Sequence, residues 1–141
     1  MEKQPNILVF MADHYRGDMA PPYGRCLTPN LDSIYREGGV AFTNCFCASP
    51  HCCPSRATFH TGLYPTEHGV WNNVAVSNTL SGGLNDGVST WSMPMAEKGY
   101  RLYHSGKWHV SVEAGPEDFG WINIYGNEKA EGIKGHRPAP N

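Results

Sequence analysis

The feature that most limits the fold of this chain is a short, unbroken apolar segment near its N-terminus. Residues 6–12 read NILVFMA, and Asp13 follows directly. A run without polar alternation is typical of a strand that is covered on both faces, as the strands of parallel sheets are. Ligands of open α/β sheets bind beyond the carboxyl ends of such strands, so Asp13 is a candidate site residue.

Helix and strand signals alternate along the rest of the chain. Thr28 is a candidate helix cap with Pro29 in the first turn, and Gly62 and Gly99 are candidate helix stops. The expected elements are a helix over 28–39, a strand over 40–46, helices over 54–61 and 91–98, a loop over 72–90, and a strand that begins at 101. This order predicts an α/β domain.

Composition narrows the class of protein. The chain has 141 residues, of which 40% are hydrophobic and 17% charged, so we expect one globular domain with a modest core. A net charge of −2 argues against general nucleic-acid binding, because there is no basic surplus to neutralise phosphates. The run over 7–12 is too short for a signal core or a membrane span, so a cytoplasmic location without membrane contact is expected.

The cysteines do not form a familiar metal or disulfide pattern. Five cysteines are present, and four of them crowd together as Cys45, Cys47, Cys52 and Cys53. Zinc ligands that share one tetrahedral centre are usually separated by two or more residues, and the adjacent pair here is not. No C-x-x-C redox pair occurs either. An odd, crowded set also argues against a disulfide framework.

The segment HCCPSRATFHTG, residues 51–62, places two thiols and Arg56 at the expected start of a helix. The positive end of the helix dipole and a nearby guanidinium both favour a thiolate, and they would also hold an oxyanion. The alternative is a buried cysteine that behaves as a small hydrophobic residue. The residues alone leave both interpretations open.

The surrounding motifs resemble the sulfatase family. Cys52-Cys53-Pro54-Ser55-Arg56 followed by Thr61-Gly62 resembles its first signature, and GYRLYHSGKWH, residues 99–109, resembles its second. NILVFMAD, TPNLDSIYREG, FTNCF and TGLYPTEHGV resemble the segments that flank these signatures. The resemblance runs through roughly residues 5–121, with the motifs in the family's order.

The resemblance implies a set of catalytic residues. Cys52 matches the cysteine that a separate maturation enzyme (formylglycine-generating or anaerobic sulfatase-maturating) converts to formylglycine, and Cys53 takes a variable position as a packing residue. Arg56 would support the aldehyde hydrate, Lys107 would contact the sulfate, and His109 would hydrogen-bond the hydrate hydroxyl. We expect Lys107 and His109 to face one side of an extended segment, with Trp108 packed on the other.

A divalent metal is also implied, with Asp13, His14 and the modified Cys52 as its ligands. Carboxylate and hydrate oxygens are hard ligands, so Ca²⁺ is expected first, with Mg²⁺ or Mn²⁺ as alternatives. Many sulfatases have Asp-Asp where this chain has Asp13-His14, which leaves the role of His14 open. His68 is expected to shape a pocket wall, and Asn72 and Asn73 to contact the substrate.

The implied function is hydrolysis of a small-molecule sulfate monoester. The implied fold is an alkaline-phosphatase-like sandwich, α/β, with a mainly parallel central sheet flanked by helices. Residues 1–141 would be the N-terminal part of one catalytic domain, because the family's second metal pair is not found in residues 110–141. Two alternatives remain: a phosphonate monoester or phosphodiester hydrolase of the same superfamily, and a truncated, non-catalytic chain.

Overall fold

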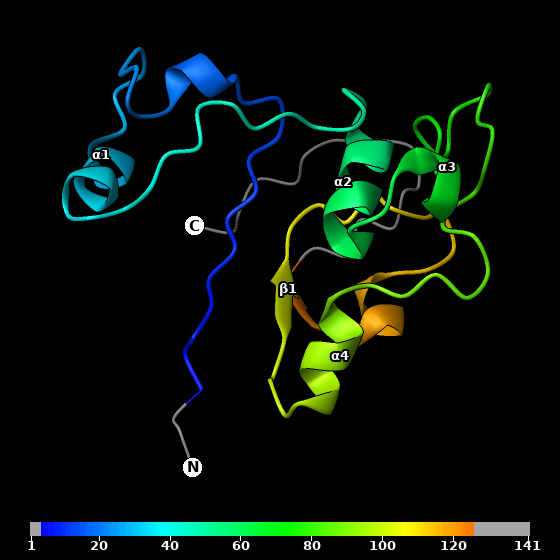
Figure 1. Cartoon of the computed structure of the whole chain (residues 1–141). Coiled ribbons are helices and arrows are strands. Elements are labelled where there is room, and N and C mark those ends of the chain that lie inside the picture. The colour runs from blue at the N-terminus through cyan, green and yellow to red at the C-terminus, as the bar shows by residue number, and fades with distance from the viewer. Residues whose placement is uncertain (1–3, 126–141) are drawn as a thin grey trace. The chain divides into compact units, whose positions relative to one another are not determined.

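The computed structural model describes residues 4–125, and these fall into two compact units whose boundary lies between Phe46 and Cys47 (Figure 1). The Gly- and charge-rich segment 126–141 lies outside the described residues. The elements are η1 (Gly17–Met19), α1 (Pro29–Arg36), α2 (Cys52–Thr61), α3 (Pro65–His68), α4 (Ser92–Glu97), β1 (Tyr103–Ser105), η2 (Pro116–Phe119) and β2 (Ile122–Tyr125). None of the described helices is long and apolar enough to cross a membrane.

The first unit confirms the helix predicted after Thr28 but not its cap. α1 begins at Pro29, and Gly38 follows its end with a φ of +110°, a conformation that glycine adopts without strain. The Thr28 hydroxyl donates to the Asp32 carboxylate at 3.1 Å and does not cap a backbone N–H. The start of α1 is therefore set by Pro29, whose φ already has a helical value.

The strands predicted over 6–12 and 40–46 are not formed, and those two predictions are wrong. Both segments are irregular, and their side chains are exposed: Leu8 is 94% exposed, Phe10 83% and Phe42 81%. A strand needs ladder hydrogen bonds from a neighbour, and neither segment has them within the described residues. The apolar pattern therefore indicates side chains that favour burial, although these segments are exposed within the described residues.

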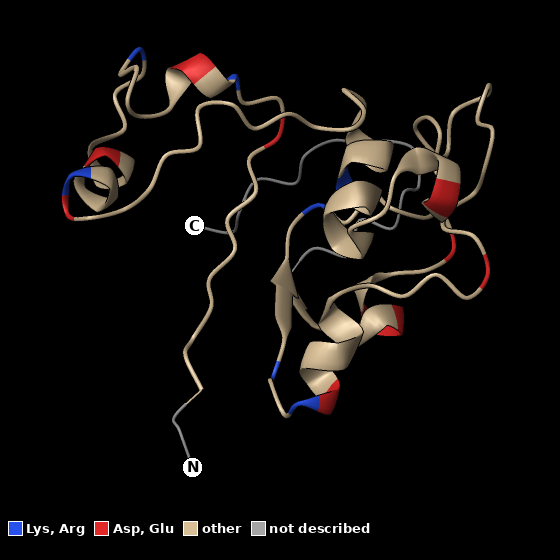
Figure 2. Ribbon diagram, in the orientation of Figure 1, with Lys and Arg blue, Asp and Glu red and all other residues tan. Residues whose placement is uncertain are grey.

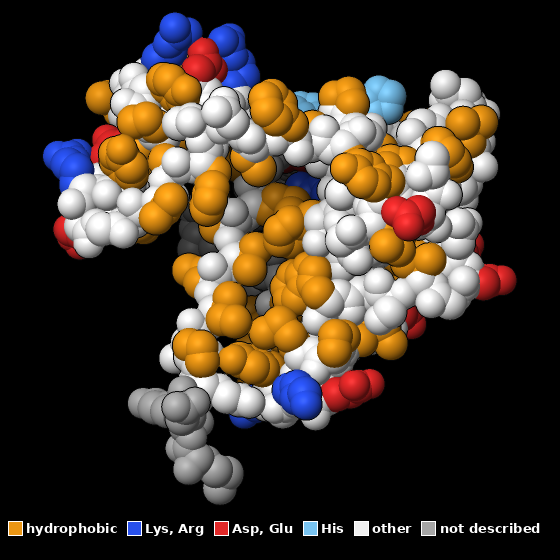
Figure 3. Space-filling model, viewed as in Figure 1, with side chains coloured by type: hydrophobic (Ala, Val, Ile, Leu, Met, Phe, Trp, Pro, Cys, Tyr) orange, Lys and Arg blue, Asp and Glu red, His pale blue; other side chains and the backbone are white. Residues whose placement is uncertain are grey.

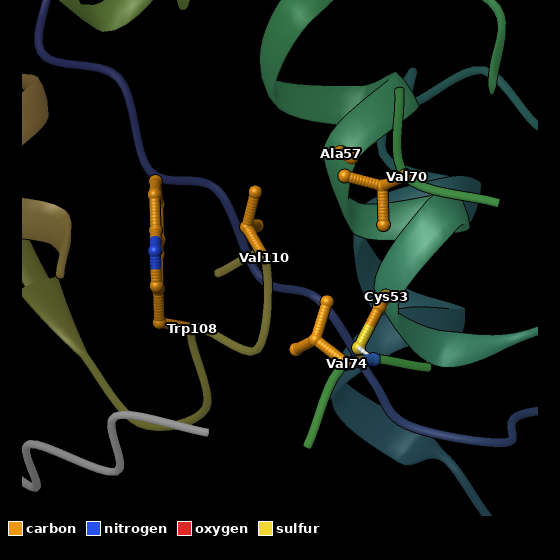
Figure 4. Packing of buried hydrophobic residues seen from close by; sticks show 6 residues of the cluster. All are labelled: Cys53, Ala57, Val70, Val74, Trp108 and Val110. Atoms are coloured by element: carbon orange, nitrogen blue, oxygen red, sulfur yellow. Dashed lines mark hydrogen bonds between the residues drawn. The ribbon is translucent and has the colours of Figure 1, made fainter. Parts of the chain in front are cut away.

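The second unit holds the core, which is built around α2. Cys53 and Ala57 on one face of this helix pack against Val70 and Val74, and Trp108 and Val110 complete the cluster (Figure 4). All six side chains are at most 1% exposed. Gly62, with a φ of +72°, ends α2 as the sequence predicts, and the helix begins at Cys52, two residues before the predicted start.

A short parallel sheet lies beside this core. β1 pairs with β2 in the register Tyr103 to Ile122, and the Ile122 N–H donates to the Leu102 carbonyl at 2.8 Å. The strand predicted from 101 onward is therefore confirmed at its centre, whereas β2, η2 and α3 were not predicted. α4 agrees with the prediction over 91–98, and Gly99 follows it with a φ of +86°. The space-filling view shows apolar side chains at the molecular surface (Figure 3), and Phe59, Trp71 and Leu80 are among those exposed in this unit.

Candidate functional site

Cys52 is the first residue of α2 and is partly exposed. The preceding residue, His51, supplies no side-chain cap, while its carbonyl accepts the Ser55 N–H at 3.1 Å. The first turn of a helix leaves backbone N–H groups that point out of its end, and they favour negative charge beside them. Cys52 thus lies where a nucleophile that becomes anionic is stabilised by the backbone.

The neighbouring thiol of Cys53 is fully buried and belongs to the core. Its Sγ accepts a hydrogen bond from the Val74 N–H at 3.3 Å (Figure 4). Burial raises the pKa of the Cys53 thiol, against the opposing effect of that hydrogen bond. A buried thiol with a raised pKa is a poor nucleophile, so the two adjacent cysteines occupy different chemical environments.

Arg56 connects the two sequence motifs, which lie far apart in the chain. The side chain is only 7% exposed, and its Nη1 donates to the carbonyl oxygen of Lys107 at 2.7 Å. The two residues are 51 positions apart. A guanidinium is always charged and costs free energy when buried, so its placement beside the start of α2 is a specific feature of this site.

Positive charge reaches the start of α2 from both motifs. Residues 47–125 contain four Lys or Arg residues, namely Arg56, Lys98, Arg101 and Lys107 (Figure 2). Two of them, Lys107 and Arg56, each act to lower the pKa of Cys53. Each of the two motifs therefore contributes a positive charge that acts on the first turn of α2.

The segment after β1 turns at Gly106 and forms no regular strand. Gly106 has a φ of +97° and His109 a φ of +52°. The alternation expected between these residues is still seen in their burial, because Lys107 and His109 are partly exposed whereas Trp108 and Val110 belong to the core. Trp108 is confirmed as a packing residue: it is 1% exposed, and its Nε1 donates to the Ala114 carbonyl at 3.1 Å.

The sequence misassigned His68, which is a structural residue. It is fully buried, and its Nε2 lies 3.1 Å from the Thr58 hydroxyl. Its Nδ1 accepts the Val70 N–H at 3.1 Å, so the ring is neutral with its proton on Nε2. Burial lowers the pKa of His68, in agreement with that state. The ring thus fastens α3 to α2 and forms no pocket wall.

The two asparagines that were expected to meet substrate are engaged by the protein itself. The Asn72 side chain donates to the Asn78 carbonyl at 2.8 Å and accepts the Leu80 N–H at 3.0 Å. The Asn73 Oδ1 accepts the Cys53 N–H at 3.1 Å. Asn72 therefore shapes its own loop, and Asn73 contacts the first turn of α2.

Asp13 and His14 belong to the first unit, and both are exposed. His14 has a φ of +54°, which is uncommon for a residue with a Cβ and is often found at functional positions. Asp18 in the same unit accepts hydrogen bonds from Arg16 at 2.7 Å and Arg25 at 2.8 Å. Its carboxylate is thus committed to a local ion-pair cluster.

Comparison with known proteins identifies the family. The sulfatase family model matches residues 5–130, which is most of the chain. The chain belongs to the sulfatase family. It is 37% identical over 115 residues to human steryl-sulfatase, covering 77% of this chain and 20% of that protein. It is 31% identical over 132 residues to the N-acetylglucosamine-6-O-sulfatase of Bacteroides thetaiotaomicron, and this match covers 92% of this chain and 22% of that protein.

A solved sulfatase structure confirms the fold class. The structure of the yidJ sulfatase from Bacteroides fragilis aligns with a TM-score of 0.66 and 33% sequence identity. The alignment covers 82% of this chain and 26% of the yidJ chain. This sulfatase chain thus has the α/β, alkaline-phosphatase-like fold with a parallel sheet and helices, in incomplete form. It spans about a fifth of the length of the curated relatives it matches, and it corresponds to their N-terminal portion.

Proposed function

We propose that this protein hydrolyses a sulfate monoester with an aldehyde that is made from Cys52. Family membership supports hydrolysis of sulfuric esters in general. The observation that carries the finer proposal is the hydrogen bond from Arg56 to the Lys107 carbonyl, which joins both signature motifs beside the start of α2. We further infer that residues 1–141 form the first part of a single catalytic domain, so the activity is proposed for the whole protein.

The roles of the side chains follow from their charge and position. A formylglycine hydrate at residue 52 would supply one hydroxyl to attack sulfur and a second whose deprotonation releases sulfate. Arg56 holds its positive charge at the start of α2 and stabilises negative charge that develops there. Lys107 binds a sulfate oxygen as a point charge. His109 accepts the hydroxyl proton as a general base.

The proposed metal ligands of the first unit are Asp13 and His14. The Asp13 carboxylate is a hard oxygen donor of the kind that Ca²⁺ and Mg²⁺ prefer, and an imidazole at the next position suits Mn²⁺ as well. The donor set therefore fits a divalent cation, with Ca²⁺ first. Such an ion would polarise the ester oxygens and balance their charge. A contribution from residue 52 to the same ion stays a prediction from the family resemblance.

Replacing Asp13 by asparagine is expected to weaken binding of Ca²⁺ by at least about tenfold, because a charged oxygen ligand is lost. The measurement is a calorimetric titration of the metal-free protein with calcium chloride, repeated with manganese chloride. Asp18→Asn is the matched control, since that carboxylate already binds Arg16 and Arg25. Equal losses in both variants would contradict a specific role for Asp13.

The function itself is tested by the chemical state of Cys52 in protein taken from its own cell. The tryptic peptide 37–56 contains four cysteines, Cys45, Cys47, Cys52 and Cys53, and fragmentation mass spectrometry resolves each of them. We expect an aldehyde at Cys52 and alkylated thiols at the other three. This result would also establish a maturation enzyme as a partner. An unmodified Cys52 would contradict the proposed activity and favour a non-catalytic relative.

A further inference from the structure

The first turn of α2 has a specific deficit of hydrogen-bond partners. The first N–H groups of any helix lack acceptors within the helix, and the cap residue usually supplies one. Here His51 makes no side-chain cap, and since Pro54 has no N–H, the Cys53 N–H is the donor that a cap can satisfy. The Cys53 N–H is instead satisfied by Asn73 Oδ1, from a residue 20 positions later. Asn73 therefore replaces the missing cap from outside the helix.

A second hydrogen bond runs in the opposite direction between the same two segments. The Val74 N–H donates to the Cys53 Sγ at 3.3 Å, and both residues are at most 1% exposed (Figure 4). The backbone of residue 53 is thus held by Asn73 and its side chain by Val74. These two hydrogen bonds run in opposite directions between residue 53 and the segment 73–74. Together they fix both the position and the rotation of the first turn of α2.

The segment that carries Asn73 is itself anchored. Asn72 closes the following loop with its hydrogen bonds to Asn78 and Leu80. On its other side, α2 is tied to the second signature motif by Arg56 and the Lys107 carbonyl. Cys52 directly precedes Cys53 in a turn that is therefore fixed from both sides.

We propose that Asn73 is the positioning residue for the nucleophile made from Cys52, an inference that rests on the proposed function. A reacting oxygen must lie within a fraction of an ångström of its productive position, and small displacements reduce turnover strongly. Without Asn73 Oδ1, the Cys53 N–H loses its side-chain acceptor, and the first turn of α2 loosens at residue 52. The segment 72–74 thus acts on catalysis through α2.

Two measurements on the same variants test this, with each substitution made in the gene and the protein purified from its own cell. The first is hydrogen exchange of the Cys53 amide by NMR. Asn73→Ala is expected to speed this exchange roughly fivefold or more, the amount expected for loss of a helix cap. Asn73→Asp keeps an acceptor oxygen and should restore protection. Asn78→Ala is the control, because it keeps the backbone carbonyl that Asn72 binds, and it should leave the Cys53 amide unchanged.

The second measurement is turnover of 4-nitrophenyl sulfate. For Asn73→Ala we expect kcat to fall roughly ten- to hundredfold with KM within about twofold, and Asn73→Asp to recover most of the loss. Faster exchange with unchanged kcat would overturn the positioning role, and so would unchanged exchange. A wild-type protein with a protected Cys53 amide but no turnover would contradict the proposed function instead, while it would support the cap itself.

Discussion

Replacement of Cys52 by alanine is expected to abolish ester hydrolysis, with kcat lowered on the order of 10⁴-fold or more. Alanine cannot be converted to the aldehyde, so no attacking atom remains at the start of α2. Cys52 is partly exposed and lies outside the core cluster, so the midpoint of thermal unfolding should change little. The assay uses protein purified from its own cell and an aryl sulfate monoester, with an aryl phosphonate monoester tested beside it.

Cys53→Ala is the matched control for this experiment. It removes a buried Sγ and leaves the Val74 N–H without its acceptor, so we expect a loss of about 1–2 kcal/mol in the free energy of unfolding. The backbone N–H that binds Asn73 is kept and the attacking atom at residue 52 remains, so turnover should fall far less than in Cys52→Ala. The proposal fails if activity depends on Cys53 and survives without Cys52. Faster phosphonate than sulfate cleavage would assign the alternative activity.

Local signals explain which elements could be predicted from the sequence. α1 starts at a proline, α2 ends at Gly62 and α4 is followed by Gly99, and each of these residues acts through its own backbone. The segments 6–12 and 40–46 were misjudged because an apolar run shows a need for burial and not the presence of a strand partner. β2 was missed since four residues carry too little pattern to separate a strand from a loop.

The residues of the candidate site were predicted from motifs, whereas the residues that hold them in place were not. Cys52, Arg56 and Lys107 stand in sequences that carry the family resemblance, and the structure joins Arg56 to the Lys107 backbone. Nothing local marks Asn73 as a helix cap, because its partner is 20 positions away. The sequence likewise does not show that both ring nitrogens of His68 form hydrogen bonds within the protein. Long-range hydrogen bonds of this kind leave no trace in residue spacing.

The free energy of unfolding is expected to fall by about 3 kcal/mol as the pH is lowered from 6.5 to about 4, through His60. This ring is 6% exposed, and it stacks against Trp91 and lies 4.5 Å from Trp108 between ring centroids. Burial lowers the pKa of His60 from 6.5 to about 4, with smaller contributions from His104 and Arg56. The described residues offer no hydrogen-bond partner to its Nδ1, so the neutral ring is the stable form.

The free energy of unfolding falls with pH because the unfolded chain takes up a proton that the folded chain does not. Between pH 6.5 and about 4 the unfolded histidine binds a proton that the folded one does not, so the stability present above pH 6.5 is lost as the pH falls toward 4. Urea unfolding at intervals from pH 7 to 4 measures this slope. His60→Phe keeps an aromatic ring in the cluster and removes the titrating group, so its stability should decline less. A His60→Phe curve parallel to that of the wild type would instead assign the acid sensitivity to His68 and His104, whose pKa values burial also lowers.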